Sequence, residues 1–352
     1  MSPMLDHIIN AAIAAQIFPG AVVQIARAGH LLHAAAYGTT MYADSGARAV
    51  ALDDIYDLAS LTKVVTATAA LVLYDAGELR LEHSAAYYLA DLAAEEVQVR
   101  HLLSHCSGLE RRLAPLCTQG AAGLRAAAWA TRPVHVPGTV SAYTNINSLL
   151  LGEIVAAVAG MPLDQALTEL VLKPLAMSST CFCPPPALQP RIVPSEWDTT
   201  WRNMLVHGVV HDESAYALGG VAGHAGLFGP ASDLLHFMRP WLEGGAWGGS
   251  QFLREATVAL ALHNHLAGIP TAAGTELAGG LGWMLERPNF MGDAPGGSFG
   301  HTGFTGTAII GVPSQQLAMV FLSNRTYPQR TPPPYRHQAV TGEVLAAVLG
   351  DG

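Results

Sequence analysis

Two β-hairpin patterns at opposite ends of the chain constrain the fold more than any other feature. Near the N-terminus, residues 21–26 and 31–37 are apolar, strand-like runs separated by a short turn. Near the other end, residues 307–312 and 317–322 repeat the pattern across a turn that starts at Pro313. Antiparallel strands from distant parts of a chain can share one sheet. The patterns therefore predict a lobe that is built from both termini.

Between the hairpins the sequence becomes rich in Ala and Leu, which is typical of helices. Helices are expected at 62–76, 148–159 and 163–172, because Gly77, Gly160 or a Lys-Pro pair follows them. Further helices are expected at 5–15 and 338–349, beside the two hairpins.

These elements predict an α+β chain with an antiparallel sheet, flanking helices and an inserted all-helical lobe. The mixed lobe is assigned to residues 1–78 and 280–352, and the mainly helical lobe to 79–279. The active site is expected between the two lobes.

Composition narrows the possible partners. Half of the 352 residues are hydrophobic and 13% are charged, which excludes a disordered chain. The longest nearly uncharged apolar run, 64–74, is shorter than the roughly 18 to 20 residues that a membrane helix needs. The net charge of −9, with no basic cluster, argues against nucleic acid or an anionic membrane surface as a partner.

Location is inferred from the N-terminus and the cysteines. The first residues lack the basic and apolar regions of a secretory signal, and four cysteines are few for this length. We expect a reduced, cytoplasmic protein, although a secreted protein whose signal has been removed would have the same sequence.

The first chemical motif is Ser60-Leu61-Thr62-Lys63, at the start of an apolar helix. Residues i and i+3 share a helix face, so Lys63 is expected beside Ser60. A serine hydroxyl is a weak nucleophile and needs a base or a positive charge next to it. A helix N-terminus with a surface lysine would also explain the pattern, but a lysine among apolar residues is costly without a partner.

Two further motifs follow in order. Tyr143-Thr144-Asn145 offers a tyrosine that can act as a general base in a cationic pocket, and an amide that can hold Lys63 and substrate. Alternatively, Tyr143 packs in a loop and Asn145 caps the next helix. His301-Thr302-Gly303 lies in a Gly-rich run immediately before the strand 307–312. A strand edge there can aim a backbone N–H across the cleft and complete an oxyanion hole, and Gly303 lets substrate approach. Alternatively, the motif is a glycine loop that leads into a hairpin.

The order S-x-x-K, Y-x-N and [KH]-T-G resembles the serine β-lactamase and penicillin-binding-protein family, closest to its class C-like branch, which also holds esterases and acyltransferases. Three flanking segments support the resemblance: HLLSHCSGL at 101–109, the Pro137-Gly138 pair before Tyr143, and GGVAGHAGLF at 219–228. The similarity extends over nearly the whole chain.

The resemblance implies a β-lactamase/transpeptidase-like fold and acyl transfer through a covalent serine. Ser60 would attack a carbonyl group, Tyr143 assisted by Lys63 would take its proton, and Asn145 would orient Lys63 and substrate. The N–H groups of Ser60 and Phe304 would hold the oxyanion, beside His301, Thr302 and Gly303. His224 would line the substrate edge, or would be buried and hydrogen-bonded instead. In this family the mechanism needs no metal or organic cofactor.

One departure from the family pattern shapes the expected substrate. His301 stands where β-lactamases and most penicillin-binding proteins have lysine, and histidine is only partly charged near neutral pH. We therefore expect a serine hydrolase of the esterase or amidase type acting on small acyl substrates. The alternatives are a β-lactamase or DD-peptidase, and a non-catalytic sensor of acyl ligands. If His301 binds a substrate carboxylate as a cation, KM should rise with pH.

A last segment remains without a firm role. His207, His211, Asp212 and Glu213 have a spacing that metal sites use on helices, but the glycine and valines between the histidines favour a loop or short strand. We expect no metal here. The resemblance to the class C-like branch, which carries a similar segment, implies a role in shaping the cleft, and the role itself stays open.

Overall fold

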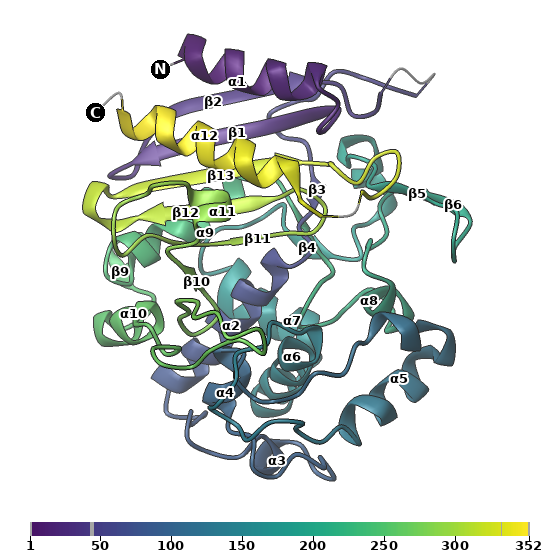
Figure 1. Ribbon diagram of the computed structural model, residues 1–352, viewed down its shortest axis with the longest axis vertical. Coiled ribbons are helices and arrows are strands. Elements are labelled where there is room, and N and C mark those ends of the chain that lie inside the picture. The colour runs from purple at the N-terminus through teal and green to yellow at the C-terminus, as the bar shows by residue number, and fades with distance from the viewer. Residues whose placement is uncertain (1, 43–45, 332, 351–352) are drawn as a thin grey trace.

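The computed structural model describes residues 2–42, 46–331 and 333–350. Its main sheet is antiparallel throughout and has the strand order β10-β11-β12-β13-β1-β2, so strands from both ends of the chain lie side by side (Figure 1). The predicted α+β architecture is confirmed. Residues 1, 43–45, 332 and 351–352 of the predicted mixed lobe lie outside the described residues. The six strands are β1 (Gly20–Arg27), β2 (His30–Gly38), β10 (Met284–Leu285), β11 (Phe299–Thr302), β12 (Ala308–Val312) and β13 (Leu317–Ser323).

Helices bury both faces of this sheet. Along β1, Val22 and Val23 point to opposite faces, as the two-residue period of a strand requires, and each belongs to a different hydrophobic core. Helices α1 (Ser2–Ala14) and α12 (Arg336–Gly350) cover the face of Val23, at the top of Figure 1. Helix α9 (Ala231–Leu242) packs on the other face, against β1, β12 and β13.

The second core is mainly helical. Its central pair is α2 (Leu61–Asp75) and α6 (Asn145–Ala159), which pack against each other below the sheet (Figure 1). The predicted helix 163–172 divides into α7 (Leu163–Leu167) and a π-helical turn η2 (Thr168–Leu172). The other helices are α3 (Ala85–Tyr88), α4 (Val99–Leu103), α5 (Gly120–Trp129), α8 (Glu213–Ala217), α10 (Glu255–Leu262) and α11 (Pro288–Met291), with the 3-10 turns η1 (Ala114–Gln119), η3 (Pro186–Arg191) and η4 (Pro313–Gln315).

Short strands also cross the region that the sequence predicts to be helical. A three-stranded sheet has the order β3-β7-β4, and two small hairpins pair β5 with β6 and β8 with β9. Strand β3 leads directly into the turn before α2, so this small sheet positions the start of that helix. These strands are β3 (Tyr56–Asp57), β4 (Cys181–Phe182), β5 (Glu196–Asp198), β6 (Met204–Val206), β7 (Leu227–Gly229), β8 (Ala246–Trp247) and β9 (Ser250–Gln251).

No single helix in the described ranges has both the length and the apolar character of a membrane span. Helix α6 and residues 163–172, which are bent by 80° relative to each other, meet the length and hydropathy criteria only when they are taken as one pair. Helix α6 is largely buried in the core.

The alternative of a glycine loop at the third motif is wrong for His301. His301 lies on β11, where Gly300 pairs with Ile310 of β12. A Cβ atom on Gly300 would lie 2.3 Å from the carbonyl oxygen of Ile309. The glycine therefore permits close strand pairing here, whereas in sequence it resembles loop composition.

Candidate active site

Ser60 lies on a tight turn between β3 and α2. The preceding residue, Ala59, has a left-handed φ of +47°, which is uncommon for a residue with a side chain. The carboxylate of Asp57 stabilises this turn by accepting hydrogen bonds from the N–H groups of Ala59 (2.8 Å) and His211 (2.6 Å). Burial raises the pKa of Asp57, and these two donors oppose that effect. The turn places Ser60 at the N-terminus of a 15-residue helix.

Lys63 lies directly against Ser60. Its ammonium group donates to Ser60 Oγ at 2.8 Å and to the backbone carbonyl of His224 at 3.1 Å. The lysine is 2% exposed, so these contacts supply the partners that a buried cation needs. The ammonium also lies 5.1 Å from the centre of the Tyr143 ring. The structure therefore brings the first two sequence motifs together.

Tyr143 lies between two histidine rings. Its ring centre is 4.7 Å from that of His105 and 5.7 Å from that of His301. The residue is 47% exposed, and its hydroxyl has no hydrogen-bond partner in the described part of the chain. The phenolic oxygen is thus available to a bound molecule.

Both histidines beside Tyr143 are neutral at neutral pH. Burial, together with the nearby charge of Lys63, lowers the pKa of His105 to about 3. The same two causes lower the pKa of His301 to about 3. A cationic role for His301 toward a substrate carboxylate therefore does not fit this site.

Hydrogen bonding assigns the tautomer of His301. Its Nδ1 lies 2.9 Å from the carbonyl oxygen of Thr302, so Nδ1 carries the proton. In the neutral ring Nε2 then has a free lone pair and acts as an acceptor. The third motif therefore presents an acceptor where the family pattern has a lysine donor.

Asn145 reaches Lys63 only indirectly. Its amide donates to Asp212 Oδ2 at 3.2 Å, and Asp212 Oδ1 lies 3.1 Å from His224 Nε2. Although burial acts to raise the pKa of Asp212, His224 and further donors hold it well below its ordinary value. The expected direct contact between Asn145 and Lys63 is replaced by this series of hydrogen bonds, which ends at the His224 carbonyl. Asn145 is also not the helix cap, since Thr144 holds that position.

The side chain of His224 does not line a substrate surface. It is completely buried and lies within hydrogen-bonding distance of Asp212 and Ser214. Of the two interpretations made from sequence, the structure therefore shows the buried, hydrogen-bonded histidine. Its backbone oxygen, which accepts from Lys63, is the part that enters the site.

Gly303 is required for protein packing. A Cβ atom there would lie 2.0 Å from Thr307 Oγ1 and 2.7 Å from the carbonyl oxygen of Leu58. The glycine therefore lets the third motif approach the Ser60 turn, which corrects the expectation that it makes room for substrate. Thr302, beside it, pairs with Ala308 of β12, and its backbone carbonyl oxygen accepts the hydrogen bond from His301 Nδ1.

A cavity of about 160 Å³ opens at Ser60. Phe304, Arg330, Asp212 and Glu213 are among the residues that line it. The carbonyl oxygen of Phe304 accepts from Arg325 Nε at 2.8 Å. The N–H groups of Ser60 and Phe304 donate to no acceptor within the described ranges, so both remain available to an oxyanion.

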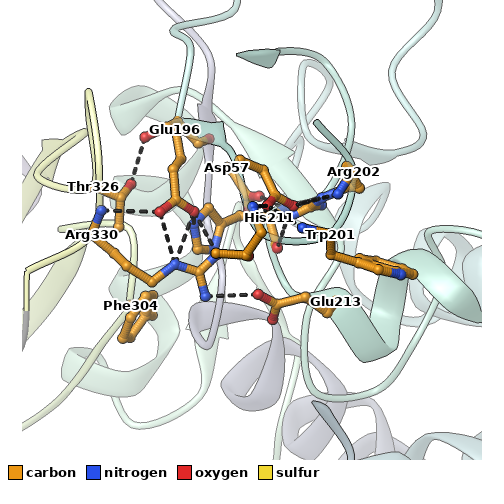
Figure 2. Close-up of polar contacts among 12 residues, drawn as sticks. Asp57, Glu196, Trp201, Arg202, His211, Glu213, Phe304, Thr326 and Arg330 are labelled. Carbon is orange, nitrogen blue, oxygen red and sulfur yellow. Dashed lines mark hydrogen bonds and ion pairs between the residues drawn. The ribbon is translucent and has the colours of Figure 1, made fainter. Parts of the chain in front are cut away.

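Ion pairs hold Arg330 beside this cavity, as Figure 2 shows. Its guanidinium donates to Glu196, with Nε 2.8 Å from Oε1, and to Glu213 Oε1 at 2.7 Å. His211 Nε2 lies 2.6 Å from the same Glu196 carboxylate. Burial acts to raise the pKa of Glu196, but His211 and Arg330 lower it to about 2.

Residues 211–213 of the segment 207–213 line the cavity at Ser60, whereas His207 does not. His207 Nε2 lies 2.9 Å from the carbonyl oxygen of Ile192, whereas His211 binds Glu196. His207 and His211 thus bind different partners. Sequence reasoning missed Arg330 and Glu196, because residues 134 positions apart give no local spacing signal. It missed Asp57 as well, although a carboxylate three residues before Ser60 is a readable signal for a stabilised turn.

The chain is similar to known proteins over most of its length. A family model described as Beta-lactamase matches residues 5–342. A curated relative from Escherichia coli O157:H7, named "Putative D-alanyl-D-alanine carboxypeptidase", is 30% identical over 319 residues, covering 79% of this chain and 72% of the relative.

Solved structures with the same fold include "EstCE1, a hydrolase with promiscuous acyltransferase activity", with a TM-score of 0.78, 21% identity and 98% of both chains covered. A class C beta lactamase superposes with a TM-score of 0.76 at 19% identity, covering 98% of this chain and 97% of the other. At these identities the structural likeness concerns the fold.

Proposed function

The chain belongs to the beta-lactamase family of serine hydrolases, and on that premise we propose that it is an esterase or amidase that hydrolyses small acyl substrates through an acyl-enzyme on Ser60. The observation that carries this proposal is the 2.8 Å contact between Lys63 Nζ and Ser60 Oγ, in a buried setting that holds the cation against the nucleophile.

The first half of the reaction forms the acyl-enzyme. Ser60 Oγ attacks the substrate carbonyl carbon while its proton passes to the phenolic oxygen of Tyr143, which reacts as the phenolate. The Lys63 ammonium stabilises negative charge on either oxygen. The N–H groups of Ser60 and Phe304 hold the oxyanion, and the leaving alcohol or amine takes the proton from Tyr143.

The second half releases the acyl group. A water molecule gives one proton to Tyr143 as its oxygen attacks the ester carbonyl, and the proton returns to Ser60 Oγ when the acid departs. Asn145 contributes through Asp212 and His224, which fix the carbonyl oxygen that orients Lys63. Asn145 is therefore proposed as a positioning residue.

Two features favour uncharged acyl substrates. The neutral His301 offers no positive charge to a substrate carboxylate. Arg330, the cation beside the Ser60 cavity, is engaged by Glu196 and Glu213. A cavity of about 160 Å³ suits a short acyl or alcohol group. These features support esters and small amides over β-lactams, which carry a carboxylate.

Covalent labelling tests the proposal. The protein is incubated with a fluorophosphonate probe and with benzylpenicillin, and its intact mass is measured, with Ser60→Ala as the control. We expect a stoichiometric adduct with the fluorophosphonate that is absent in Ser60→Ala. No adduct with either reagent would contradict the covalent mechanism. A fluorophosphonate adduct without turnover of any p-nitrophenyl ester would favour a sensor of acyl ligands.

The second candidate is a D-alanyl-D-alanine carboxypeptidase or β-lactamase, favoured by the name of the relative that is 30% identical. Release of D-alanine from a peptide ending in D-alanyl-D-alanine is compared with hydrolysis of short-chain p-nitrophenyl esters and of nitrocefin. We expect the highest kcat/KM with an ester. A higher kcat/KM for the peptide or for nitrocefin would reverse this order.

A further inference from the structure

A second cavity, of about 300 Å³, lies between α9 and the sheet, and none of its lining residues belongs to the Ser60 cavity. Its floor is formed by β1 and β13 and its wall by α9, with Trp247 of β8 at one side. Binding sites for small molecules begin at about this volume and combine apolar surface with a few polar groups.

Small side chains leave this space open. Ala26 of β1 and Ala318 of β13 are paired across the sheet, and both line the cavity. Gln24 lies two residues before Ala26, and therefore on the same face of β1. Helix α9 packs on this face of the sheet but does not fill the volume above the alanines.

Gln24 brings a polar group to the floor of the cavity. The residue is only 8% exposed, and its amide makes no hydrogen bond to any part of the chain that the structure describes. The amide atoms are not among the fully buried polar atoms that lack a partner, so they face the open space of the cavity. A ligand in the cavity can therefore form a hydrogen bond with this amide.

The entrance is aromatic and apolar. The rings of His236 and Trp247 lie 5.2 Å apart along one wall. Leu31 of β2 also lines the cavity and is 59% exposed. A flat ring between Leu31 and Trp247 would cover both side chains.

Arg239 of α9 supplies the charge. Its Nε donates to Glu243 at 2.6 Å, and its guanidinium lies 5.6 Å from the Trp247 ring centre. The two Nη nitrogens have no hydrogen-bond partner within the described ranges. The guanidinium packs against Gly29, where a Cβ atom would lie 3.2 Å from its central carbon. The free side of Arg239 can therefore pair with a carboxylate.

We propose that this cavity binds a small aromatic monocarboxylate, with its ring between Leu31 and Trp247, its carboxylate on the Nη nitrogens of Arg239, and a polar group at its far end on the Gln24 amide. This site is separate from Ser60, and the proposal does not depend on the hydrolytic function.

The test measures binding to the full chain carrying Ser60→Ala, by saturation-transfer NMR and titration. The probe is 4-hydroxyphenylacetate, compared with phenylacetate, which lacks the hydroxyl, and 4-hydroxyphenylacetamide, which lacks the charge. We expect saturable binding of the first, about ten-fold weaker binding of the amide, and an intermediate result for phenylacetate.

Two variants locate the binding. Ala26→Leu fills the floor and should abolish binding, whereas Arg239→Gln should weaken it about ten-fold, as the uncharged probe does. Arg125→Gln, an exposed arginine on α5, is the matched control and should leave the Kd unchanged. Thermal unfolding shows whether Ala26→Leu is folded. If Ala26→Leu is unfolded, the Kd of Arg239→Gln still tests the proposal. No saturable binding, or a Kd unchanged in Arg239→Gln, would overturn the proposal.

Discussion

The hydroxyl of Thr305 donates a 2.7 Å hydrogen bond to the backbone carbonyl oxygen of Asp57, across 248 positions of sequence. Thr307 makes a similar bond to the carbonyl oxygen of Leu58 at 3.2 Å. The segment after the third motif is thereby fixed to the turn that carries Ser60. The geometry of the oxyanion donors Ser60 and Phe304 depends on these two bonds, because one donor lies on each side of them.

Gly303→Ala should disrupt this junction. The added methyl group would meet Thr307 Oγ1 at 2.0 Å and the Leu58 oxygen at 2.7 Å, so one side must move. We expect kcat for ester hydrolysis to fall at least about 100-fold, which is the typical effect of a misplaced oxyanion donor, with a loss of about 1–3 kcal/mol in the free energy of unfolding. Gly296→Ala is the control, since its Cβ would meet only Glu286 Oε1 at 3.6 Å. Equal activity in both variants would contradict the packing role of Gly303.

The fold was predictable because its strands carry their signal locally. The two hairpins have the alternation and turn residues that identify paired strands, and the structure pairs β1 with β2 and β12 with β13 as expected. Strand β11 escaped detection because its glycine, Gly300, is required by close contact with the neighbouring strand, and the sequence of β11 alone does not reveal that contact.

The site could be predicted only where its residues lie close together in sequence or belong to the motifs of the family. The contact between Ser60 and Lys63 follows from helix geometry. The contact between Asn145 and Asp212 does not, because it joins the starts of two helices that only tertiary packing brings together. The charge of His301 also depends on burial and on Lys63, and neither can be read from the His-Thr-Gly motif.

Substitutions of Glu196 and Arg330 should have strongly non-additive effects on the free energy of unfolding. Glu196 has a side chain only 5% exposed and is shared by His211 and Arg330. Arg330→Met leaves this carboxylate with one partner fewer and should cost about 3–5 kcal/mol, as removal of one member of a buried pair does. Urea unfolding of Glu196→Gln, Arg330→Met and the double variant measures the coupling. We expect the double variant to lose at least about 1 kcal/mol less than the sum of the single losses; strict additivity would show that the pair contributes nothing as a pair.

Acid should destabilise the protein partly through His337. Burial and the nearby Arg325 lower the pKa of His337 to about 3, and both ring nitrogens are buried without a hydrogen-bond partner in the described chain. Between pH 6.5 and 3 the unfolded chain binds a proton here that the folded protein does not. Stability is therefore lost as pH falls through this range, by up to about 1.4 kcal/mol per pH unit. His337→Phe should reduce that slope between pH 6 and 4, measured by urea unfolding at each pH. An unchanged slope would mean that the folded protein protonates His337 readily.

The neutral state of His301 predicts how substrate binding depends on pH. With its pKa lowered to about 3, chiefly by burial and then by Lys63, His301 keeps the same charge from pH 5.5 to 8. KM for p-nitrophenyl butyrate should therefore change less than about two-fold over this range, since a neutral acceptor contributes no titrating charge. His301→Asn, which also offers an acceptor, should show the same flat profile. His301→Lys should instead raise kcat/KM for nitrocefin relative to the ester by about ten-fold, because it introduces a cation for the β-lactam carboxylate. A KM that rises about ten-fold from pH 5.5 to 8 in the wild type and not in His301→Asn would show that the histidine binds as a cation, contrary to the structure.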